Sequence, residues 1–279
     1  MEATTRDSGR PPSMSRRTLI GAGAVSVAAA LAGCSDSSRT VAAQRPSRVR
    51  REGVRNVVLV HGAYADGSCW VDVIRRLQAE GLTATAVQNP LTSLADDAAA
   101  TQRALDIQTG PAILVGHSFA GTVITEVGDH PRAANLVYVA ARAPDVGEDY
   151  TALAKRFPTP PASAGLVYRD GFGQLTEQSF LKDFANGVDP VRARVLYSVQ
   201  GRVSATLFSE RTTVAAWRSK PTRYAISRHD RTTSPKLERF LADRMRAETI
   251  ELDSGHLSMI THAPQITGLI LDAASQPNP

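Results

Sequence analysis

Residues 112–120 read AILVGHSFA, and this stretch decides the fold. Four apolar residues typical of a buried strand lead into Gly116-His117-Ser118, and residues that form a helix follow. A serine at such a strand-to-helix turn has a strained backbone and points its hydroxyl out above the sheet. The nearby helix N-terminus favours developing negative charge through its free N–H groups and its dipole. The stretch therefore predicts an activated serine, Ser118, at the edge of a parallel sheet.

The motif around Ser118 departs from the pattern G-x-S-x-G at one position. Ala120 stands where the closing glycine is usual, and Gly121 comes directly after it. A glycine at this place lets the helix approach neighbouring backbone closely. Because alanine is the smallest residue with a Cβ, we interpret the exchange as tolerated.

The alternation of strand and helix extends to both sides of this stretch. We expect strands at 56–60, 83–87, 112–115, 136–140, 223–227 and 248–252, and helices at 69–80, 94–108, 118–128, 234–246 and 258–274. Strands that are apolar throughout and alternate with helices imply a parallel sheet covered on both faces. Ligands of such sheets bind at the carboxyl ends of the strands. The fold class is therefore α/β, with about six mostly parallel strands flanked by helices.

Residues 142–221 interrupt the alternation. They contain the proline-rich segment FPTPP at 157–161, a hairpin pattern at 166–175 around Asp170-Gly171, and helix-like stretches near 177–185 and 190–200. Their place after a strand end favours an inserted lid over the active edge of the sheet. A purely structural excursion is the alternative.

A serine hydroxyl is a weak nucleophile, so it needs a base that a third group orients. His256, in DSGHLSM, follows the last predicted strand and is the expected base. Asp230, in ISRHDRTTSP, is the preferred acid because one helix and one strand separate it from His256, in the chain order Ser, Asp, His. Asp145, in AARAPD, is the second candidate because it follows the strand at 136–140. Either carboxylate could instead cap a helix or a turn.

The first strand ends in His61-Gly62, and this turn predicts an oxyanion hole. One N–H comes from Ala63, after the turn, and the second from Phe119, directly after the nucleophile. No pair of histidines has a convincing metal-site spacing, and no nucleotide-binding glycine motif follows a strand. We therefore expect neither a metal nor a cofactor.

The first 54 residues predict an export signal and a flexible tether. The stretch SRRTLIGAGAVSVAAALAGC at 15–34 has two arginines before an apolar run of 15 residues, which is shorter than the roughly 20 that span a bilayer. Arg16-Arg17 resembles a twin-arginine signal, and LAGC resembles a bacterial lipobox, which implies acylation of Cys34. We expect a signal peptide at 1–33, a lipidated Cys34 with a flexible tether at 34–54, and a folded domain at 55–279. The protein would then be exported and anchored to the membrane; a chance cysteine is the alternative.

The charge of the chain is concentrated near its start. The net charge is +5 over 279 residues, yet residues 56–279 hold 22 basic and 23 acidic residues. The folded body has no basic excess, so we expect no nucleic-acid partner. The chain has two cysteines. If Cys34 is acylated, only Cys69 remains, and no intramolecular disulfide can form.

Four segments, HGAYADGSCW, NPLTSLADD, GHSFAGTVI and LVYVAARAPD, carry a resemblance to the α/β-hydrolase superfamily. They are similar to the cofactor-free esterase branch related to plant methylesterases and hydroxynitrile lyases. The resemblance implies an α/β-hydrolase fold with a lid, and a serine hydrolase that acts on a small carboxylic ester. It implies these roles: Ser118 as nucleophile, Asp230 as acid, His256 as base, and the amides of Ala63 and Phe119 as oxyanion hole.

Two other functions fit the same scaffold. A hydroxynitrile lyase of this branch is expected to carry a lysine beside the base, whereas Leu257 follows His256 here. A non-catalytic, surface-anchored binding lipoprotein would not need the complete set of serine, acid and histidine. The substrate pocket is less defined by the sequence: the candidate lining residues are Tyr64, Trp70, Phe119, Tyr168, Phe172 and Trp217.

Overall fold

The computed structural model describes residues 53–276. The predicted signal peptide, Cys34 and nearly all of the predicted tether lie outside these residues. The first and last described residues lie side by side, because the Val54 N–H donates a hydrogen bond to the Ala274 carbonyl at 3.0 Å.

The described residues form a six-stranded sheet in which every neighbouring pair of strands is parallel. Its strand order is β2-β1-β3-β4-β8-β9. The strands are β1 (Asn56–Val60), β2 (Thr83–Val87), β3 (Ala112–His117), β4 (Ala133–Val139), β8 (Thr222–Ser227) and β9 (Glu248–Leu252). The predicted fold class is confirmed, and all six predicted strands are present.

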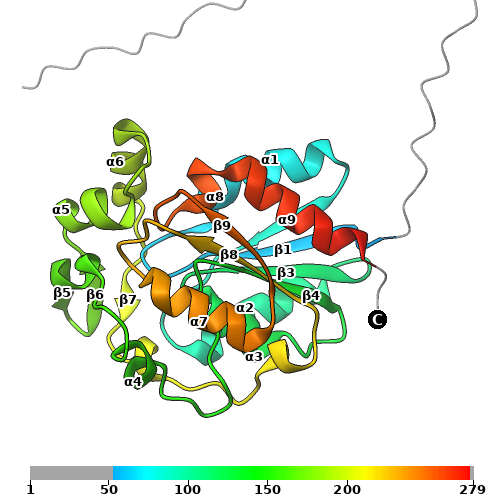
Figure 1. The fold of residues 1–279 in the computed structure, drawn as a ribbon, viewed down its shortest axis with the longest axis horizontal. Coiled ribbons are helices and arrows are strands. Elements are labelled where there is room, and N and C mark those ends of the chain that lie inside the picture. The colour runs from blue at the N-terminus through cyan, green and yellow to red at the C-terminus, as the bar shows by residue number, and fades with distance from the viewer. Residues whose placement is uncertain (1–52, 277–279) are drawn as a thin grey trace, which may run out of the picture. The chain divides into compact units, whose positions relative to one another are not determined.

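Helices cover both faces of the sheet (Figure 1). On one face lie α1 (Val71–Ala79), α8 (Ser258–Thr261) and α9 (Ala263–Ser275), and on the other α2 (Leu94–Asp106), α3 (Ala120–Val127) and α7 (Pro235–Met245). Every residue of β1, β3 and β4 is buried as a result. This burial explains why these strands are apolar on both sides rather than alternating.

The register between β1 and β3 places the turn after β1 next to the turn after β3, which carries Ser118. Val60, the last residue of β1, pairs with Gly116, and His117, the last residue of β3, pairs with Val139 of β4. The turns that follow β1 and β3 therefore leave the sheet side by side at its carboxyl edge.

Two predicted helix boundaries are wrong. Ser118 does not belong to the helix after β3, because α3 begins at Ala120. The predicted helix at 258–274 is two helices, α8 and α9, which are separated at His262 (φ −127°, ψ 37°). Pro264 explains the break, because it has no N–H with which to continue α8 and instead occupies the first turn of α9.

The segment between β4 and β8, which we call the cap, contains small elements. They are α4 (Tyr150–Ala154), β5 (Leu166–Arg169), β6 (Phe172–Leu175), α5 (Glu177–Ser179), α6 (Pro190–Ser198) and β7 (Val203–Ser204), with a π-helical turn at Phe180–Phe184. β5 and β6 form the predicted hairpin, and its turn residues Asp170 and Gly171 both have positive φ, at 51° and 78°. Figure 1 shows most of the cap gathered at one end of the sheet, on the left of the view.

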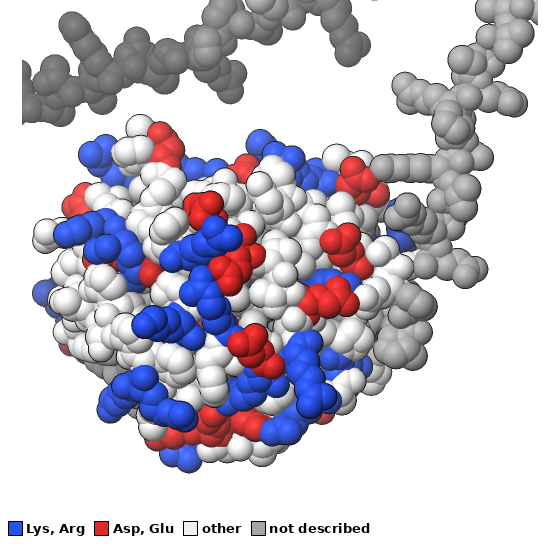
Figure 2. All heavy atoms as spheres, viewed as in Figure 1, with Lys and Arg blue, Asp and Glu red and all other residues white. Residues whose placement is uncertain are grey.

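The surface of the described domain carries both signs of charge. Figure 2 shows basic and acidic side chains interspersed on the visible face. None of the helices within 53–276 combines the length and the apolar character that a membrane crossing requires.

Candidate active site

The turn after β3 presents Ser118 in a strained conformation. Its φ is 55°, in the left-handed region that non-glycine residues avoid. Hydrogen bonds hold the turn on both sides: the Ser118 N–H donates to the Val139 carbonyl at 3.1 Å, and the Ser118 carbonyl accepts from the Arg142 N–H at 3.0 Å. Such strain persists only where the surrounding structure fixes it, and it is frequent at active sites.

Close backbone contacts explain two glycines near Ser118. A Cβ on Gly62 would lie 2.7 Å from the Ser118 Cβ, so only glycine lets the turn after β1 pass the nucleophile turn. A Cβ on Gly121 would overlap the Arg142 carbonyl oxygen. The close approach of α3 to the neighbouring backbone thus requires a glycine at Gly121, whereas Ala120 is accommodated in the core with no exposed surface.

His256 contacts Ser118 although the two residues are 138 positions apart. The His256 Nε2 lies 2.8 Å from the Ser118 Oγ, and the His256 Nδ1 lies 2.5 Å from an oxygen of Asp230. A carboxylate only accepts hydrogen bonds, so the ring proton is assigned to Nδ1, and Nε2 accepts from the serine hydroxyl. The imidazole is fully buried. The Ser118 hydroxyl therefore faces a base whose tautomer the carboxylate fixes.

Asp230 is held as an acceptor on both of its oxygens. One oxygen accepts from the N–H groups of Thr232 and Thr233, at 2.6 and 2.8 Å, and the other contacts the His256 ring at 2.5 Å. The residue follows β8 and is 7% exposed. Two amide donors stabilise the ionised carboxylate in this buried position.

Asp145, the second candidate acid, lies away from this contact. It forms an ion pair with Arg218, whose Nε–H donates to the Asp145 carboxylate at 2.9 Å, and the Asp145 N–H donates to the Glu148 carboxylate at 2.9 Å. The Arg218 guanidinium lowers the pKa of Asp145 by hydrogen bonding to its carboxylate. The structure therefore brings Asp230, and not Asp145, to His256.

The amides of Ala63 and Phe119 have no hydrogen-bond acceptor among the described residues. Both residues line the cavity that contains Ser118. The His61 ring stabilises the turn that carries Ala63: its Nδ1–H donates to the Gly62 carbonyl at 2.9 Å, and its Nε2 accepts from the Asn89 N–H at 2.9 Å. Two unpaired N–H groups beside a nucleophile can bind an oxyanion.

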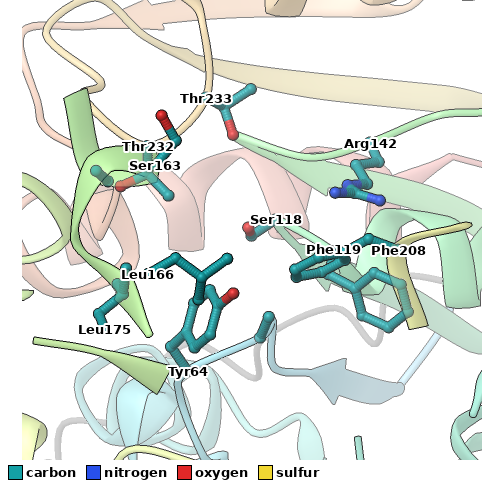
Figure 3. Close-up of a pocket in the computed structure, with 12 residues that line it drawn as sticks. Tyr64, Ser118, Phe119, Arg142, Ser163, Leu166, Leu175, Phe208, Thr232 and Thr233 are labelled. Carbon is teal, nitrogen blue, oxygen red and sulfur yellow. The ribbon is translucent and has the colours of Figure 1, made fainter. Parts of the chain in front are cut away.

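A cavity of about 220 Å³ opens over Ser118. The body of the domain contributes Tyr64, Phe119, Thr232 and Thr233, and the cap contributes Arg142, Ala162, Ser163, Leu166, Leu175 and Phe208. Figure 3 shows Ser118 in the middle, with Arg142, Phe119 and Phe208 on one side and Leu166, Leu175 and Tyr64 on the other. The cap thus completes the walls of the cavity, as expected for a lid.

Only two of the six aromatic residues considered for the pocket line this cavity, namely Tyr64 and Phe119. Trp70 is fully buried in the core, and Trp217 is buried with its indole N–H donating to the Pro144 carbonyl at 2.8 Å. Tyr168 is 55% exposed. The sequence pattern does not distinguish a residue that lines a cavity from one that fills the core.

Sequence reasoning did not assign a role to His117, which the structure places behind the base. The His117 Nε2–H donates to the backbone carbonyl of His256 at 3.1 Å, and the two ring centroids are 4.5 Å apart. Burial and the neighbouring His256 ring lower the pKa of His117 well below its usual value, so the ring is neutral. The signal was available, because His117 occupies the middle of the Gly116-His117-Ser118 turn.

Two further polar residues near the site went unnoticed in the sequence. Glu238, on α7, accepts from the Ser227 N–H at 3.0 Å, and burial together with the Asp230 carboxylate raises the pKa of Glu238 well above its usual value. Arg142 lines the cavity. A single charged residue between apolar neighbours in AARAPD was the available signal for Arg142.

Within residues 53–276 there is no group of three or more His, Cys, Asp and Glu side chains that could hold a metal ion. Cys69 is buried and unpaired, and burial raises its pKa.

Two curated relatives share sequence with this chain. The carbendazim-hydrolysing esterase of Nocardioides sp. (strain SG-4G) is 32% identical over 126 residues, which are 40% of this chain and 52% of that protein. The match therefore spans about half the length of that esterase. The alpha/beta hydrolase nvfD of Aspergillus novofumigatus is 24% identical over 243 residues, which are 79% of this chain and 96% of that protein.

Solved structures share the fold at lower identity. A pyrethroid hydrolase from Sphingobium faniae JZ-2 superposes with a TM-score of 0.67 at 18% identity, over 80% of this chain and 98% of that one. A methylesterase from Arabidopsis superposes with a TM-score of 0.66 at 16% identity, over 79% and 98% of the two chains. The sequence also matches the alpha/beta hydrolase family over residues 57–267. With this match over most of its length, the chain belongs to the alpha/beta hydrolase family.

Proposed function

We propose that this protein is a serine esterase that hydrolyses small carboxylic esters through an acyl-enzyme intermediate. The observation that carries the proposal is the continuous hydrogen-bonded contact from the Ser118 Oγ to His256, 2.8 Å, and from His256 to Asp230, 2.5 Å. Ser118 is the nucleophile, His256 the general base and Asp230 the group that orients the base.

In the first step, the Ser118 oxygen attacks the ester carbonyl while His256 Nε2 takes the hydroxyl proton. The carbonyl oxygen becomes an oxyanion, and the N–H groups of Ala63 and Phe119 bind it. The tetrahedral intermediate collapses, the bond to the alcohol oxygen breaks, and the alcohol leaves with the proton from His256. The acyl group is then bound to Ser118.

In the second step, water attacks the acyl-enzyme. His256 takes a proton from the water, the oxyanion forms again at the same two amides, and the bond to the Ser118 oxygen breaks. Ser118 recovers its proton from His256, and the carboxylic acid leaves. The sum of the two steps is ester plus water giving acid plus alcohol.

The geometry supports electrostatic stabilisation of both oxyanions. An oxyanion donor of this kind contributes roughly 2.7–4 kcal/mol to transition-state stabilisation in comparable enzymes. The amides of Ala63 and Phe119 have no competing acceptor among the described residues, so they need not break a hydrogen bond when the oxyanion forms. Buried His256 and Asp230 are likewise already in place.

The related proteins agree with an esterase. One relative is named as an esterase that hydrolyses carbendazim, and solved structures of the same fold include a methylesterase. The buried Leu257 follows His256, at the position where a hydroxynitrile lyase of this branch is expected to carry a lysine. Ester hydrolysis is therefore preferred over cyanohydrin cleavage.

Hydrolysis of short-chain p-nitrophenyl esters tests the proposal. Wild-type protein is expected to hydrolyse p-nitrophenyl acetate or butyrate with saturation kinetics, and Ser118→Ala is expected to lose at least about 10³-fold in kcat. The Ser68→Ala variant, which changes an exposed serine on the turn after β1, is the control. Equal rates in wild type and Ser118→Ala would refute the esterase.

For the segment outside the described residues, we propose export and anchoring through an acylated Cys34. The support is the sequence alone: Arg16-Arg17, the short apolar run and LAGC. Labelling cells with a palmitate analogue is expected to mark the wild type in the membrane fraction and not Cys34→Ala. An unlabelled wild-type protein in the cytoplasm would reject this proposal without affecting the esterase.

A further inference from the structure

Arg142 is a cation at the wall of the active-site cavity. It follows β4, and its N–H is the group that donates to the Ser118 carbonyl. Its guanidinium carbon lies 4.4 Å from the Phe208 ring centroid, 4.7 Å from that of Tyr150 and 5.7 Å from that of Phe119. Aromatic rings thus surround the guanidinium beside the nucleophile, and Figure 3 shows it on the Phe119 side of the cavity.

The rings leave the hydrogen-bonding capacity of Arg142 unused. A cation above an aromatic ring is attracted to the face of that ring, whereas the N–H groups of a guanidinium lie in its own plane and require acceptors. Among the described residues, no oxygen accepts a hydrogen bond from the Arg142 side chain and no carboxylate pairs with it. Arg142 is also the only charged residue in the described lining of the cavity.

Arg244 shows how this chain treats an arginine with similar packing. Arg244 also lies over aromatic rings, 5.5 Å from the centroids of Trp217 and Phe240. It donates to both carboxylate oxygens of Glu148, at 2.7 and 3.0 Å. An aromatic surround therefore does not replace the carboxylate at Arg244, and the missing partner of Arg142 is a difference between two comparable sites.

Burial makes the lack of a partner unfavourable. Arg142 is partly buried, and desolvation lowers its pKa, although an arginine stays charged in proteins at neutral pH. An anion that enters the cavity would supply the negative charge and the hydrogen-bond acceptors that the Arg142 guanidinium lacks. The planar fork of a guanidinium matches the two oxygens of a carboxylate.

We propose that Arg142 binds a carboxylate of the substrate, so that the preferred substrates are small esters that carry a free carboxylate at one end. The inference rests on the esterase proposed above and names its substrate class. One side of the cavity has Arg142, and the other has the apolar side chains of Leu166 and Leu175, with Ser118 between them (Figure 3). A molecule with an anionic end and an apolar end fits this polarity.

The test compares the monomethyl ester of glutaric acid, which carries one carboxylate, with the neutral dimethyl ester. For the full-length wild type we expect kcat/KM to be at least tenfold higher for the monomethyl ester. For Arg142→Met we expect the ratio of the two kcat/KM values to fall at least tenfold, mostly through KM of the anionic ester. Arg142→Lys keeps the charge without the fork and is expected to have an intermediate ratio.

Arg202→Met is the matched control. Arg202 is an exposed arginine of the cap that lies over the Phe172 ring, 5.6 Å from its centroid, and it does not line the cavity. Its loss removes one positive charge, as the Arg142 variant does, and one cation–π contact where the Arg142 variant loses three. The substrate ratio of Arg202→Met is expected to stay within twofold of wild type. An equal fall in both variants would show a general charge effect and would overturn the proposal.

A second measurement does not depend on a variant that folds. Glutarate is expected to inhibit wild-type hydrolysis of the neutral ester competitively, at concentrations at least tenfold lower than glutaramide. A wild type that prefers the dimethyl ester and is inhibited equally by both compounds would overturn the carboxylate site while the esterase stands. A wild type that hydrolyses neither these methyl esters nor p-nitrophenyl esters would overturn the esterase and this inference with it.

Discussion

The loops after β4 and β8 leave neighbouring strands at the same edge of the sheet, and each carries an aspartate. Asp230, after β8, is buried and contacts two amides and the His256 ring. Asp145, after β4, pairs with the exposed arginine Arg218. The β4 loop turns its cation, Arg142, towards the cavity instead. A position at a strand end therefore makes an aspartate a candidate for the catalytic acid. The residues that the fold places around its carboxylate decide whether it can take that role.

The largest effect that we expect is a loss of kcat on substitution of Asp230, which would distinguish it from Asp145. Asp230→Asn keeps the shape of the side chain but no longer fixes the proton of His256 on Nδ1, so kcat is expected to fall by about 10⁴-fold. Steady-state hydrolysis of p-nitrophenyl butyrate measures this. A loss smaller than tenfold in a folded Asp230→Asn protein would show that Asp230 does not serve as the acid.

A smaller effect concerns the residue behind the base. His117→Leu removes the hydrogen bond from the His117 ring to the His256 backbone carbonyl and the contact between the two rings, so the backbone that carries the base is held less firmly. Displacements of about 1 Å in an active site reduce rates up to about 10²-fold, so we expect kcat to fall 10- to 100-fold with little change in KM. His117→Gln, which can still donate, should recover part of the loss. An unchanged kcat in His117→Leu would exclude a positioning role.

The sequence predicted the sheet and the chain order of Ser118, Asp230 and His256, because both depend on local patterns. A buried parallel strand is apolar throughout, and a strand followed by a small polar turn marks the edge where sites form. The partners across the fold were not predictable in this way. The contact from His117 to His256 joins residues 139 positions apart, and the aromatic surround of Arg142 comes from three different segments.

The sequence favoured Asp230 over Asp145 as the acid but did not exclude Asp145, for the same reason. Both aspartates follow a strand. Only the three-dimensional structure shows that Asp145 forms an ion pair with Arg218, whereas Asp230 contacts two backbone amides and the His256 imidazole. Helix ends were also misplaced where one residue overrides a periodic pattern. Pro264 divides the last helix although its apolar spacing is continuous.

A third carboxylate, that of Asp97, extends the comparison to the free energy of unfolding. Asp97 is fully buried, accepts from the Leu91 N–H at 2.8 Å, and has one oxygen without a partner. Burial raises its pKa to about 7. The folded state therefore holds a proton that the unfolded state releases near pH 4, so the free energy of unfolding falls as the pH rises from 4 to 7 and is then constant.

Asp97→Asn tests this linkage. The variant does not titrate, so its free energy of unfolding relative to wild type should improve by a few kcal/mol between pH 4.5 and pH 8. Urea unfolding at the two pH values measures the difference. Asp96→Asn, at the exposed neighbouring position, is the control, because its carboxylate has its pKa lowered by hydrogen bonds from Thr92 and Ser93. A difference in the free energy of unfolding between Asp97→Asn and wild type that does not change with pH would contradict the raised pKa of this buried carboxyl group.

The smallest effect is expected at the other aspartate. Asp145→Asn weakens the ion pair with Arg218, whose side chain is 59% exposed, and exposed pairs contribute about 0–1 kcal/mol. We expect the free energy of unfolding to change by less than about 1 kcal/mol and kcat to stay within about twofold of wild type. A large loss of activity in Asp145→Asn would mean that the β4 loop, and not the β8 loop, supplies the acid.

Covalent labelling tests the central claim most directly, because it reports both reactivity and the residue that reacts. Full-length protein treated with an alkyl fluorophosphonate should gain one phosphonyl group, and peptide mapping should locate it on Ser118. Asp230→Asn should be labelled much more slowly than Asp145→Asn. A folded protein that stays unlabelled, or a label on any other residue, would contradict the account.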